Sequence, residues 1–169
     1  MHPPEEEKPN TGFKHDRCVN HFITLILRPL ETFAKGVAMA KGKILVVDDE
    51  VEVREVIKLQ LENKGLHVLE AVDGQNAIDI LKSGDNMVNV GVILCDIRMP
   101  RVNGVECIQF LREQAPGIPI VVVTGYPDAE LATDLLEKGV KEYLVKPVQK
   151  EKLLAVVEEQ IAAGKALDF

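Results

Sequence analysis

The 169-residue sequence has no tryptophan, only three cysteines and no long apolar run. A membrane span needs about 20 consecutive apolar residues, so we expect no membrane partner. The net charge of −7 leaves no broad basic surface for a phosphate backbone, and nucleic acid is not expected as a direct ligand. Hydrophobic residues make up 46% of the chain and charged residues 28%, which excludes wholesale disorder and indicates one globular core.

We expect neither a secretory signal nor a disulfide framework. Acidic residues at Glu5–Glu7 stand where a signal peptide carries basic ones, and the apolar stretch that follows is short and interrupted. Three cysteines cannot all pair within one chain, and the scatter of Cys18, Cys95 and Cys107 favours a reducing compartment. These features predict a cytoplasmic location.

Composition changes near residue 40. Residues 1–40 hold five acidic and five basic residues, so the whole charge of −7 lies in residues 41–169. The first segment contains four prolines and no sustained helical or strand period, whereas regular patterning begins at Lys43. We therefore interpret residues 1–40 as a poorly ordered N-terminal extension of unknown role and residues 41–165 as the domain.

Three hypotheses remain open for the extension. His15, Cys18 and His21 recur every three residues and offer soft metal ligands, although a fourth ligand is lacking. The apolar stretch Phe22–Leu27 is a candidate for docking a partner or the domain. Met39 is a candidate for the biological start of the chain.

From Lys43 onward, apolar runs alternate with amphipathic stretches. Apolar residues at every position of a run are typical of a strand buried on both faces, and the runs predict strands at Ile44–Val47, Leu66–Glu70, Val90–Cys95, Ile120–Val123 and Glu142–Val145. The stretches between and after them predict five helices, whose apolar faces include Val53, Val56, Ile57 and Leu61 in the first, Ala77, Ile78 and Leu81 in the second, Val105, Ile108 and Leu111 in the third, Leu131, Leu135 and Leu136 in the fourth, and Leu153, Val157 and Ile161 in the fifth. Strict alternation predicts an α/β fold with a doubly wound five-stranded parallel sheet flanked by five helices.

Polar side chains follow four of the predicted strands. Asp48 and Asp49 follow the first strand, Asp96 the third, Thr124 the fourth and Lys146 the fifth. Ligands bind at this edge of doubly wound sheets. Taken singly, an aspartate or the threonine is explained as a helix cap and the lysine as solvated. Together, three crowded carboxylates call for a hard cation such as Mg²⁺, and a carboxylate beside a cation and an ammonium can accept a phosphoryl group.

Four blocks of this sequence resemble the motifs of response-regulator receiver domains. The resemblance covers residues 43 to about 163, and its blocks are Ile44–Glu50, Val92–Gly104, Val121–Gly125 and Tyr143–Pro147. It implies a flavodoxin-like sheet with the strand order 2-1-3-4-5. It also implies a two-component phosphorelay function, in which a sensor histidine kinase or phosphotransfer protein donates a phosphoryl group to the domain.

The resemblance implies a role for each residue at the strand ends. Asp96 matches the phosphoacceptor. The metal ligands of Mg²⁺ match Asp48, Asp49, Asp96 and the main-chain carbonyl of Arg98. Such a domain is a signalling device that catalyses only its own phosphotransfer and dephosphorylation, and is not an enzyme acting on an external substrate.

Further matches concern the switch. Thr124 matches the hydroxyl that binds a phosphoryl oxygen, Lys146 the lysine that pairs with the phosphoryl group, and Tyr143 the aromatic switch that turns inward. The bond to Pro147 is usually cis in this family, and Gly104 matches a turn that lets the loop after the acceptor close. Phosphorylation is implied to change the surface of the fourth helix, fifth strand and fifth helix, and so to signal to a partner protein.

Three competing interpretations stay open. A small Mg²⁺-dependent phosphatase of the haloacid-dehalogenase type would carry a second aspartate two residues after the nucleophile, where this chain has Arg98. The second is a receiver used only for binding, and the third is a fragment of a longer regulator whose output domain is absent. Arg98 and Tyr126 flank the site in sequence, which predicts slow autodephosphorylation, and Cys95 and Cys107 are expected in the core.

Overall fold

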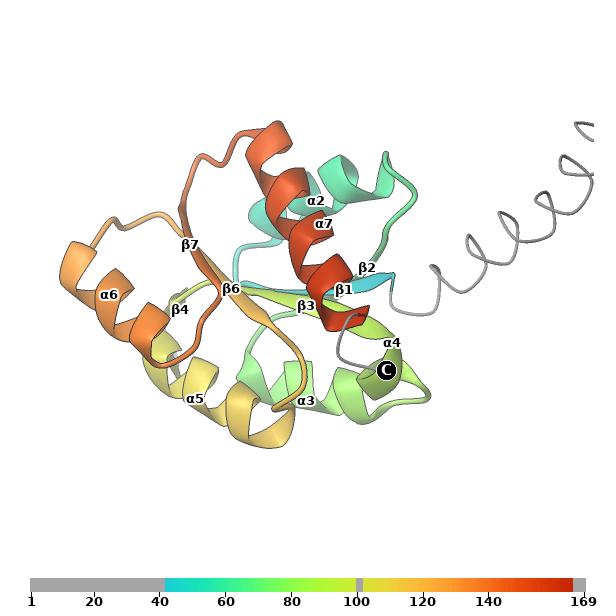
Figure 1. Cartoon of the computed structure of the whole chain (residues 1–169), viewed down its shortest axis with the longest axis horizontal. Coiled ribbons are helices and arrows are strands. Elements are labelled where there is room, and N and C mark those ends of the chain that lie inside the picture. Colours follow the sequence, from blue (N-terminus) through green and yellow to red (C-terminus); the bar gives the residue numbers. More distant parts are fainter. Residues whose placement is uncertain (1–41, 100–101, 166–169) are drawn as a thin grey trace, which may run out of the picture. The chain divides into compact units, whose positions relative to one another are not determined.

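The computed structural model describes residues 42–99 and 102–165. The hypotheses on residues 1–40 lie outside the described residues. Five parallel strands form one sheet in the order β2-β1-β3-β6-β7 (Figure 1). Counted along the chain, this is the predicted order 2-1-3-4-5, and the strands are β1 (Lys43–Val47), β2 (His67–Ala71), β3 (Val90–Cys95), β6 (Ile120–Thr124) and β7 (Glu142–Val145).

The central strands are buried on both faces, as their apolar sequences predict. In β1, Leu45 and Val47 pack into one hydrophobic cluster, whereas Ile44 and Val46 pack into another on the opposite face. This division follows from the two-residue period of a strand. β1 pairs in parallel with β2 on one side and with β3 on the other, so the strand ends come together at one edge.

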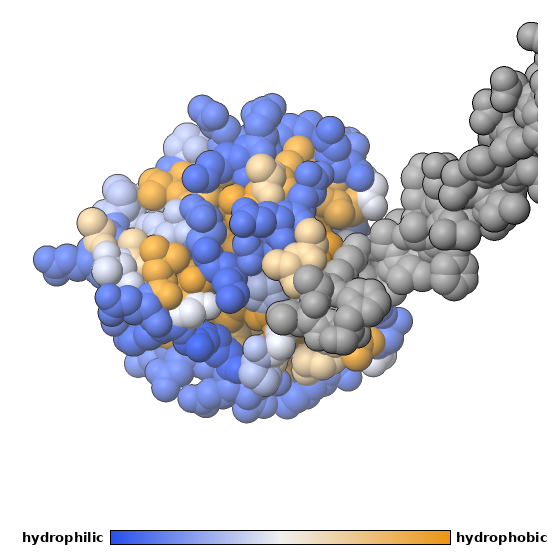
Figure 2. Space-filling view, in the orientation of Figure 1, coloured by the Kyte–Doolittle hydropathy of each residue, from blue (hydrophilic) through white to orange (hydrophobic). Residues whose placement is uncertain are grey.

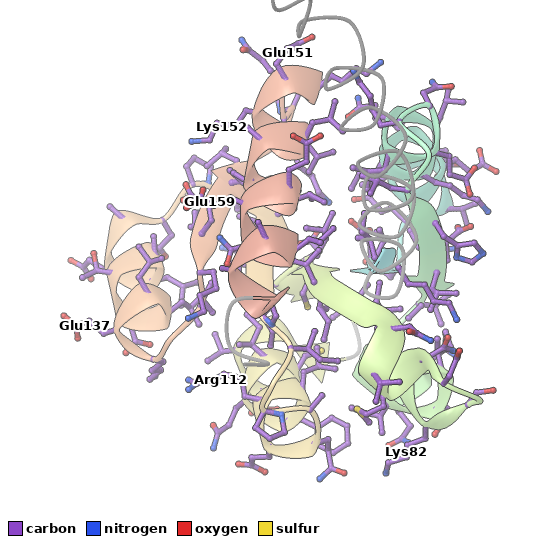
Figure 3. The ribbon with its side chains drawn as sticks, turned by 45° about the vertical axis from the view of Figure 1, so that its right-hand side comes forward. Lys82, Arg112, Glu137, Glu151, Lys152 and Glu159 are labelled. Carbon is purple, nitrogen blue, oxygen red and sulfur yellow. The ribbon has the colours of Figure 1, made fainter. Side chains whose placement is uncertain are left out.

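Two layers of helices cover the sheet. One hydrophobic cluster joins the sheet to α2 (Val51–Glu62) and α7 (Lys150–Lys165), and the other joins it to α3 (Gly74–Lys82), α5 (Gly104–Gln114) and α6 (Ala129–Glu137) (Figure 1). On α7 the charged side chains of Glu151 and Glu159 are exposed, whereas Lys152 reaches β7, where its Nζ lies 3.5 Å from Glu142 Oε1 (Figure 3). The doubly wound α/β fold is thereby confirmed.

Two short features replace segments that the sequence predicts as loops. A four-residue helix, α4 (Asn86–Asn89), precedes β3, and an antiparallel pair, β4 (Arg98–Met99) and β5 (Val102–Asn103), follows it. The loop around α4 is held by side chains, because Lys43 Nζ donates to both Asp85 and Asn86. Gly104 is the first residue of α5 and not part of a separate turn.

Val56 and Leu136, which the sequence predicts on the buried faces of their helices, are exposed. Val56 of α2 is 55% exposed and Leu136 of α6 is 44% exposed, although the helical period places both beside buried residues. Their neighbours Ile57 and Leu135 are buried, and one residue along a helix turns the side chain by about 100°. The hydrophobic patches on the face drawn in Figure 2 are separate and lie among hydrophilic residues.

The core cysteines are confirmed. Cys95 and Cys107 are free and buried, and their sulfur atoms lie 4.0 Å apart between β3 and α5. Within residues 42–99 and 102–165, no helix is long and apolar enough to cross a membrane.

Candidate functional site

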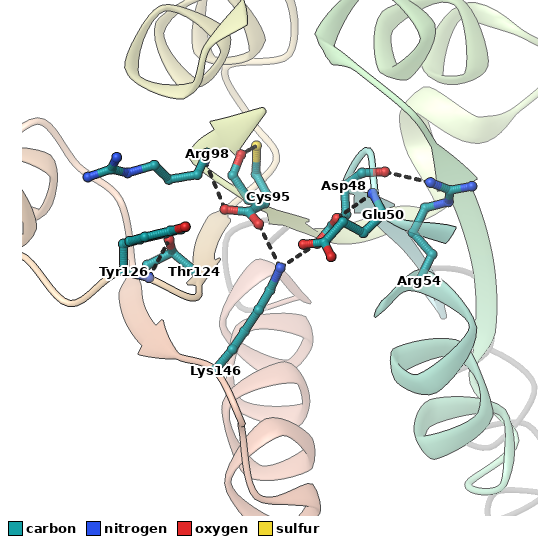
Figure 4. Close-up of polar contacts among 9 residues, drawn as sticks. Asp48, Glu50, Arg54, Cys95, Arg98, Thr124, Tyr126 and Lys146 are labelled. Atoms are coloured by element: carbon teal, nitrogen blue, oxygen red, sulfur yellow. Dashed lines mark hydrogen bonds and ion pairs between the residues drawn. The ribbon is translucent and has the colours of Figure 1, made fainter. Parts of the chain in front are cut away.

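The site is built where three parallel strands end. Asp48 follows β1, Asp96 follows β3 and Lys146 follows β7, and the parallel register brings these positions to one edge of the sheet (Figure 4). Asp48 and Asp96 are buried, with exposed fractions of 2% and 4%. A buried carboxylate needs a compensating charge or hydrogen bonds, so both aspartates mark a specific polar site.

Lys146 supplies that charge. Its Nζ atom lies 2.6 Å from Asp48 Oδ2 and 2.6 Å from Asp96 Oδ2, and its side chain is only 17% exposed (Figure 4). Burial by itself lowers the pKa of Lys146, but the hydrogen bonds to Asp48 and Asp96 outweigh it and raise the pKa above the usual lysine value. The ammonium therefore stays charged at neutral pH and links the two carboxylates.

A third carboxylate completes an acidic cluster. Oxygens of Asp48, Glu50 and Asp96 all lie within 4.8 Å of one another, and the Glu50 main-chain N–H donates to Asp48 Oδ1 at 2.9 Å. Glu50 was not predicted as a site residue, whereas the predicted Asp49 is not in this group. The donor set is oxygen alone, which fits Mg²⁺.

The second oxygen of Asp96 is bound by the segment that follows it. The main-chain N–H of Arg98 donates to Asp96 Oδ1 at 2.9 Å. The Arg98 guanidinium extends over the ring of Tyr126, 4.4 Å from its centroid, which is the range of a cation–π contact. This contact connects β4 to the loop after β6 beside Asp96.

Thr124 and Tyr143 meet at the same loop. Thr124 is fully buried, and its hydroxyl accepts a hydrogen bond from the Tyr126 main-chain N–H at 3.3 Å. The Tyr143 hydroxyl donates to the Tyr126 carbonyl at 3.0 Å, and burial raises the pKa of Tyr143. Thr124 is not the cap of α6, because Asp128 accepts the capping hydrogen bond from Leu131.

The N-terminus of α2 shows that Asp48 is not a helix cap. Glu50 is at the N-cap position of α2 and makes no capping bond through its side chain. Asp48 instead directs its oxygens to Glu50 and Lys146. The Lys146–Pro147 peptide bond is cis, as the resemblance implied.

An α/β fold whose parallel sheet carries buried aspartates and a lysine at the C-terminal ends of its strands is the arrangement that the resemblance to receiver domains implies. The family model for the response regulator receiver domain matches residues 44–158 of this chain. The chain therefore belongs to the response regulator receiver family, whose domains receive phosphoryl groups in phosphorelays and interact with histidine kinases or phosphotransfer proteins.

Characterised proteins show the same relationship. The chain is 31% identical over 121 residues to the transcriptional regulatory protein FixJ of Bradyrhizobium diazoefficiens, covering 72% of this chain and 57% of FixJ. It is 32% identical over 123 residues to the DNA-binding transcriptional regulator NtrC of Proteus hauseri, covering 73% of this chain and 25% of NtrC. It thus spans only part of the length of these curated relatives.

A solved structure is similar to this domain in fold as well as in sequence. The receiver domain protein from Clostridium thermocellum superposes with a TM-score of 0.68 at 30% sequence identity, and the alignment covers 75% of this chain and 98% of that protein.

Proposed function

We propose that Asp96 is the phosphoacceptor of this receiver domain. A carboxylate oxygen of Asp96 attacks the phosphorus of a phosphohistidine on a sensor kinase or phosphotransfer protein. The new P–O bond forms as the P–N bond breaks, and the electron pair leaves with the imidazole. Lys146, 2.6 Å from Asp96, is within reach of the phosphoryl oxygens, where its positive charge would stabilise the charge on the transferred group.

The acidic cluster supports a divalent cation beside the acceptor. We propose that Asp48, Asp49, Asp96 and the main-chain carbonyl of Arg98 hold Mg²⁺, and the proximity of Glu50 to Asp48 and Asp96 adds Glu50 to the candidates. Bound Mg²⁺ would neutralise negative charge on the phosphoryl oxygens. The residues of this chain would orient the acceptor, since both oxygens of Asp96 are fixed by hydrogen bonds.

The signal would pass from Thr124 to Tyr143. We propose that the Thr124 side chain moves so that its hydroxyl donates to a phosphoryl oxygen, and that this movement breaks the bond it accepts from the Tyr126 N–H. The same loop holds the Tyr143 hydroxyl through the Tyr126 carbonyl. A change in this loop would therefore bias the position of Tyr143 and the α6–β7–α7 surface, which would bind a partner protein. This chain covers only 57% of FixJ and 25% of NtrC. That partial coverage supports the alternative in which this domain is part of a longer regulator that also carries an output domain.

The observation that carries this proposal is the Lys146 bridge between two buried aspartates. We expect the wild-type protein to take up one phosphoryl group from acetyl phosphate in the presence of Mg²⁺, and Asp96→Asn to take up none, because the amide lacks the nucleophilic carboxylate. Intact-mass measurement detects the added phosphoryl group. Asp79→Asn, an exposed site on α3, is the matched control and should label like wild type.

Two outcomes would contradict the proposal. Undiminished labelling of Asp96→Asn would remove Asp96 from the role of acceptor. Repeated turnover of a phosphomonoester, in place of one stoichiometric label, would favour the phosphatase interpretation. Arg98 occupies the position at which that class of enzyme carries its acid–base aspartate, so we expect no such turnover.

A further inference from the structure

Arg54 is a buried cation that the proposed phosphotransfer does not use. It lies on α2, one turn after the loop that carries Asp48, and its side chain is only 9% exposed. Arginine side chains are rarely buried unless they are paired, so the position of Arg54 calls for partners that justify its desolvation.

The partners of Arg54 are Asp48, which follows β1, and Glu70, which lies on the neighbouring strand β2. Its Nη1 atom donates to the main-chain carbonyl of Asp48 at 2.7 Å (Figure 4). Its Nε atom lies 3.5 Å from Glu70 Oε2 on β2, and Nε has no hydrogen-bond partner in the described part of the chain. The well-formed bond of Arg54 is thus the one to Asp48, and Glu70 supplies a counter-charge at longer range.

Glu70 has a better partner on the same helix. Lys58 Nζ lies 2.6 Å from Glu70 Oε1, and the hydrogen bond from Lys58 lowers the pKa of Glu70. Arg54 lowers the pKa of Glu70 as well, but less than Lys58 does. The contact that depends on Arg54 alone is therefore the one to the Asp48 carbonyl.

Asp48 is held by four separate groups. Its N–H donates to the Ala71 carbonyl at 3.1 Å, and its two carboxylate oxygens accept from Glu50 and Lys146. Arg54 binds the remaining polar group, the carbonyl that leads into Asp49 and Glu50. That carbonyl belongs to the peptide unit between Asp48 and Asp49, so its orientation sets the direction in which the chain enters the acidic loop.

We propose that Arg54 is a positioning residue for the cation site. By fixing the Asp48 carbonyl, it holds the β1–α2 loop in the conformation that brings the carboxylates together for a divalent cation. This inference rests on the proposed function, because it concerns the same Mg²⁺ site. Groups that orient metal ligands in this way typically change metal affinity by about 10- to 100-fold when they are removed.

The test is Mg²⁺ binding measured by titration calorimetry on the full chain. Arg54→Met keeps the length and apolar stem of the side chain but removes the donor, and we expect its Mg²⁺ dissociation constant to rise about 10-fold or more. Lys58→Met is the matched control, because it removes a cation from the same helix and the same Glu70 without touching Asp48. We expect Lys58→Met to bind Mg²⁺ like wild type.

A second variant controls for unfolding of Arg54→Met. Arg54→Lys keeps a positive charge near Glu70 but lacks the planar fork of donors, and circular dichroism would establish that it is folded. We expect it to bind Mg²⁺ more weakly than wild type as well. A folded Arg54→Met or Arg54→Lys with wild-type affinity overturns the positioning role, as does an equal loss of affinity in Lys58→Met.

The titration also separates this inference from the proposed function. If wild type binds Mg²⁺ and is labelled by acetyl phosphate while the Arg54 variants bind Mg²⁺ equally well, only the role of Arg54 fails. If wild type binds no Mg²⁺, the proposed cation site fails, and the role of Arg54 fails with it.

Discussion

Arg98 and Tyr126 are two exposed side chains near the proposed acceptor Asp96. Arg98 follows Asp96 by two residues, and its guanidinium lies over the ring of Tyr126, which follows Thr124 by two. Because this pair connects the segments that follow β3 and β6, we expect it to restrict the approach of a hydrolytic water from that side. Slow autodephosphorylation stays a prediction, and the contact gives it a test.

We predict that Arg98→Ala and Tyr126→Ala each shorten the lifetime of the phosphorylated protein. An exposed cation–π contact contributes about 0.5–1 kcal/mol, which corresponds to an increase in the hydrolysis rate of roughly 2- to 5-fold. The decay of the label after removal of the donor gives the rate. Arg112→Ala, at an exposed position in the last turn of α5, should decay like wild type.

A lifetime of seconds in the wild-type protein would contradict the shielding by Arg98 and Tyr126. Equal lifetimes in wild type and both alanine variants would show that the pair does not restrict water.

Sequence patterns predicted some residues of the site better than others. Asp48, Asp96 and Lys146 each directly follow a strand and Thr124 ends one, so the strand prediction also predicts their common edge. Glu50 was not predicted as a site residue because it is the third consecutive acidic residue, and the direction of its side chain depends on the conformation of the loop. Arg54 was not predicted because a charged residue on an amphipathic helix is normally solvated. Only the position of the Asp48 carbonyl in the structure shows that Arg54 is buried against the loop.

At the scale of elements, the strands were predictable because the sheet is covered on both faces. Val90–Cys95 has its predicted bounds and is buried at every position, since a continuous apolar run has few alternatives to burial. The edge strand Glu142–Val145 also has its predicted bounds, although it is only partly buried. The helix α4 and the β4–β5 pair were missed. Both are short, and both depend on contacts with distant residues, as in the bonds of Lys43 to Asp85 and Asn86, which a local pattern does not contain.

The packing of α3 against α5 depends on a glycine at the start of α3. A Cβ atom at Gly74 would come within 2.7 Å of Cys107 Sγ, and Cys107 is itself buried against Cys95. The two helices approach each other here because position 74 has no side chain. The thiol of Cys107 therefore fills the space that a larger residue on α3 would need.

We predict that Gly74→Ala lowers the free energy of unfolding by about 1–3 kcal/mol, the usual effect of overpacking a core. Urea denaturation followed by circular dichroism measures the change. The double variant Gly74→Ala with Cys107→Ala should be less destabilised than the sum of the two single variants, because the added methyl group then occupies the space of the lost sulfur. Strict additivity would show that the two residues do not compete for this space.

At the scale of the whole molecule, the described core is built entirely from residues 44–161, and the family match covers 44–158. We predict that a chain beginning at Met39 folds and takes up the Mg²⁺-dependent label as the full chain does. Far-UV circular dichroism and intact mass are the measurements. A chain that ends at Val145 is the matched control and should not label, because it lacks Lys146 and α7.

Loss of structure in the chain that begins at Met39 would contradict the interpretation of residues 1–40 as an extension. Loss of labelling with retained structure would assign them a part in phosphotransfer.

The Lys146 bridge joins parts of the chain that are far apart in sequence. Its partners Asp48 and Asp96 are 98 and 50 residues away in the chain, so that β3 and β6 both lie between Asp48 and Lys146, and β6 lies between Asp96 and Lys146. Asp48, Asp96 and Lys146 come together only where β7 is paired with β6, and β6 with β3, in the same sheet as β1. A nascent, truncated or partly unfolded chain would carry Asp96 without its counter-ion and would be a poor acceptor. We therefore expect phosphorylation of Asp96 to depend on the pairing of strands from both ends of the domain, and to report that this part of the sheet has formed.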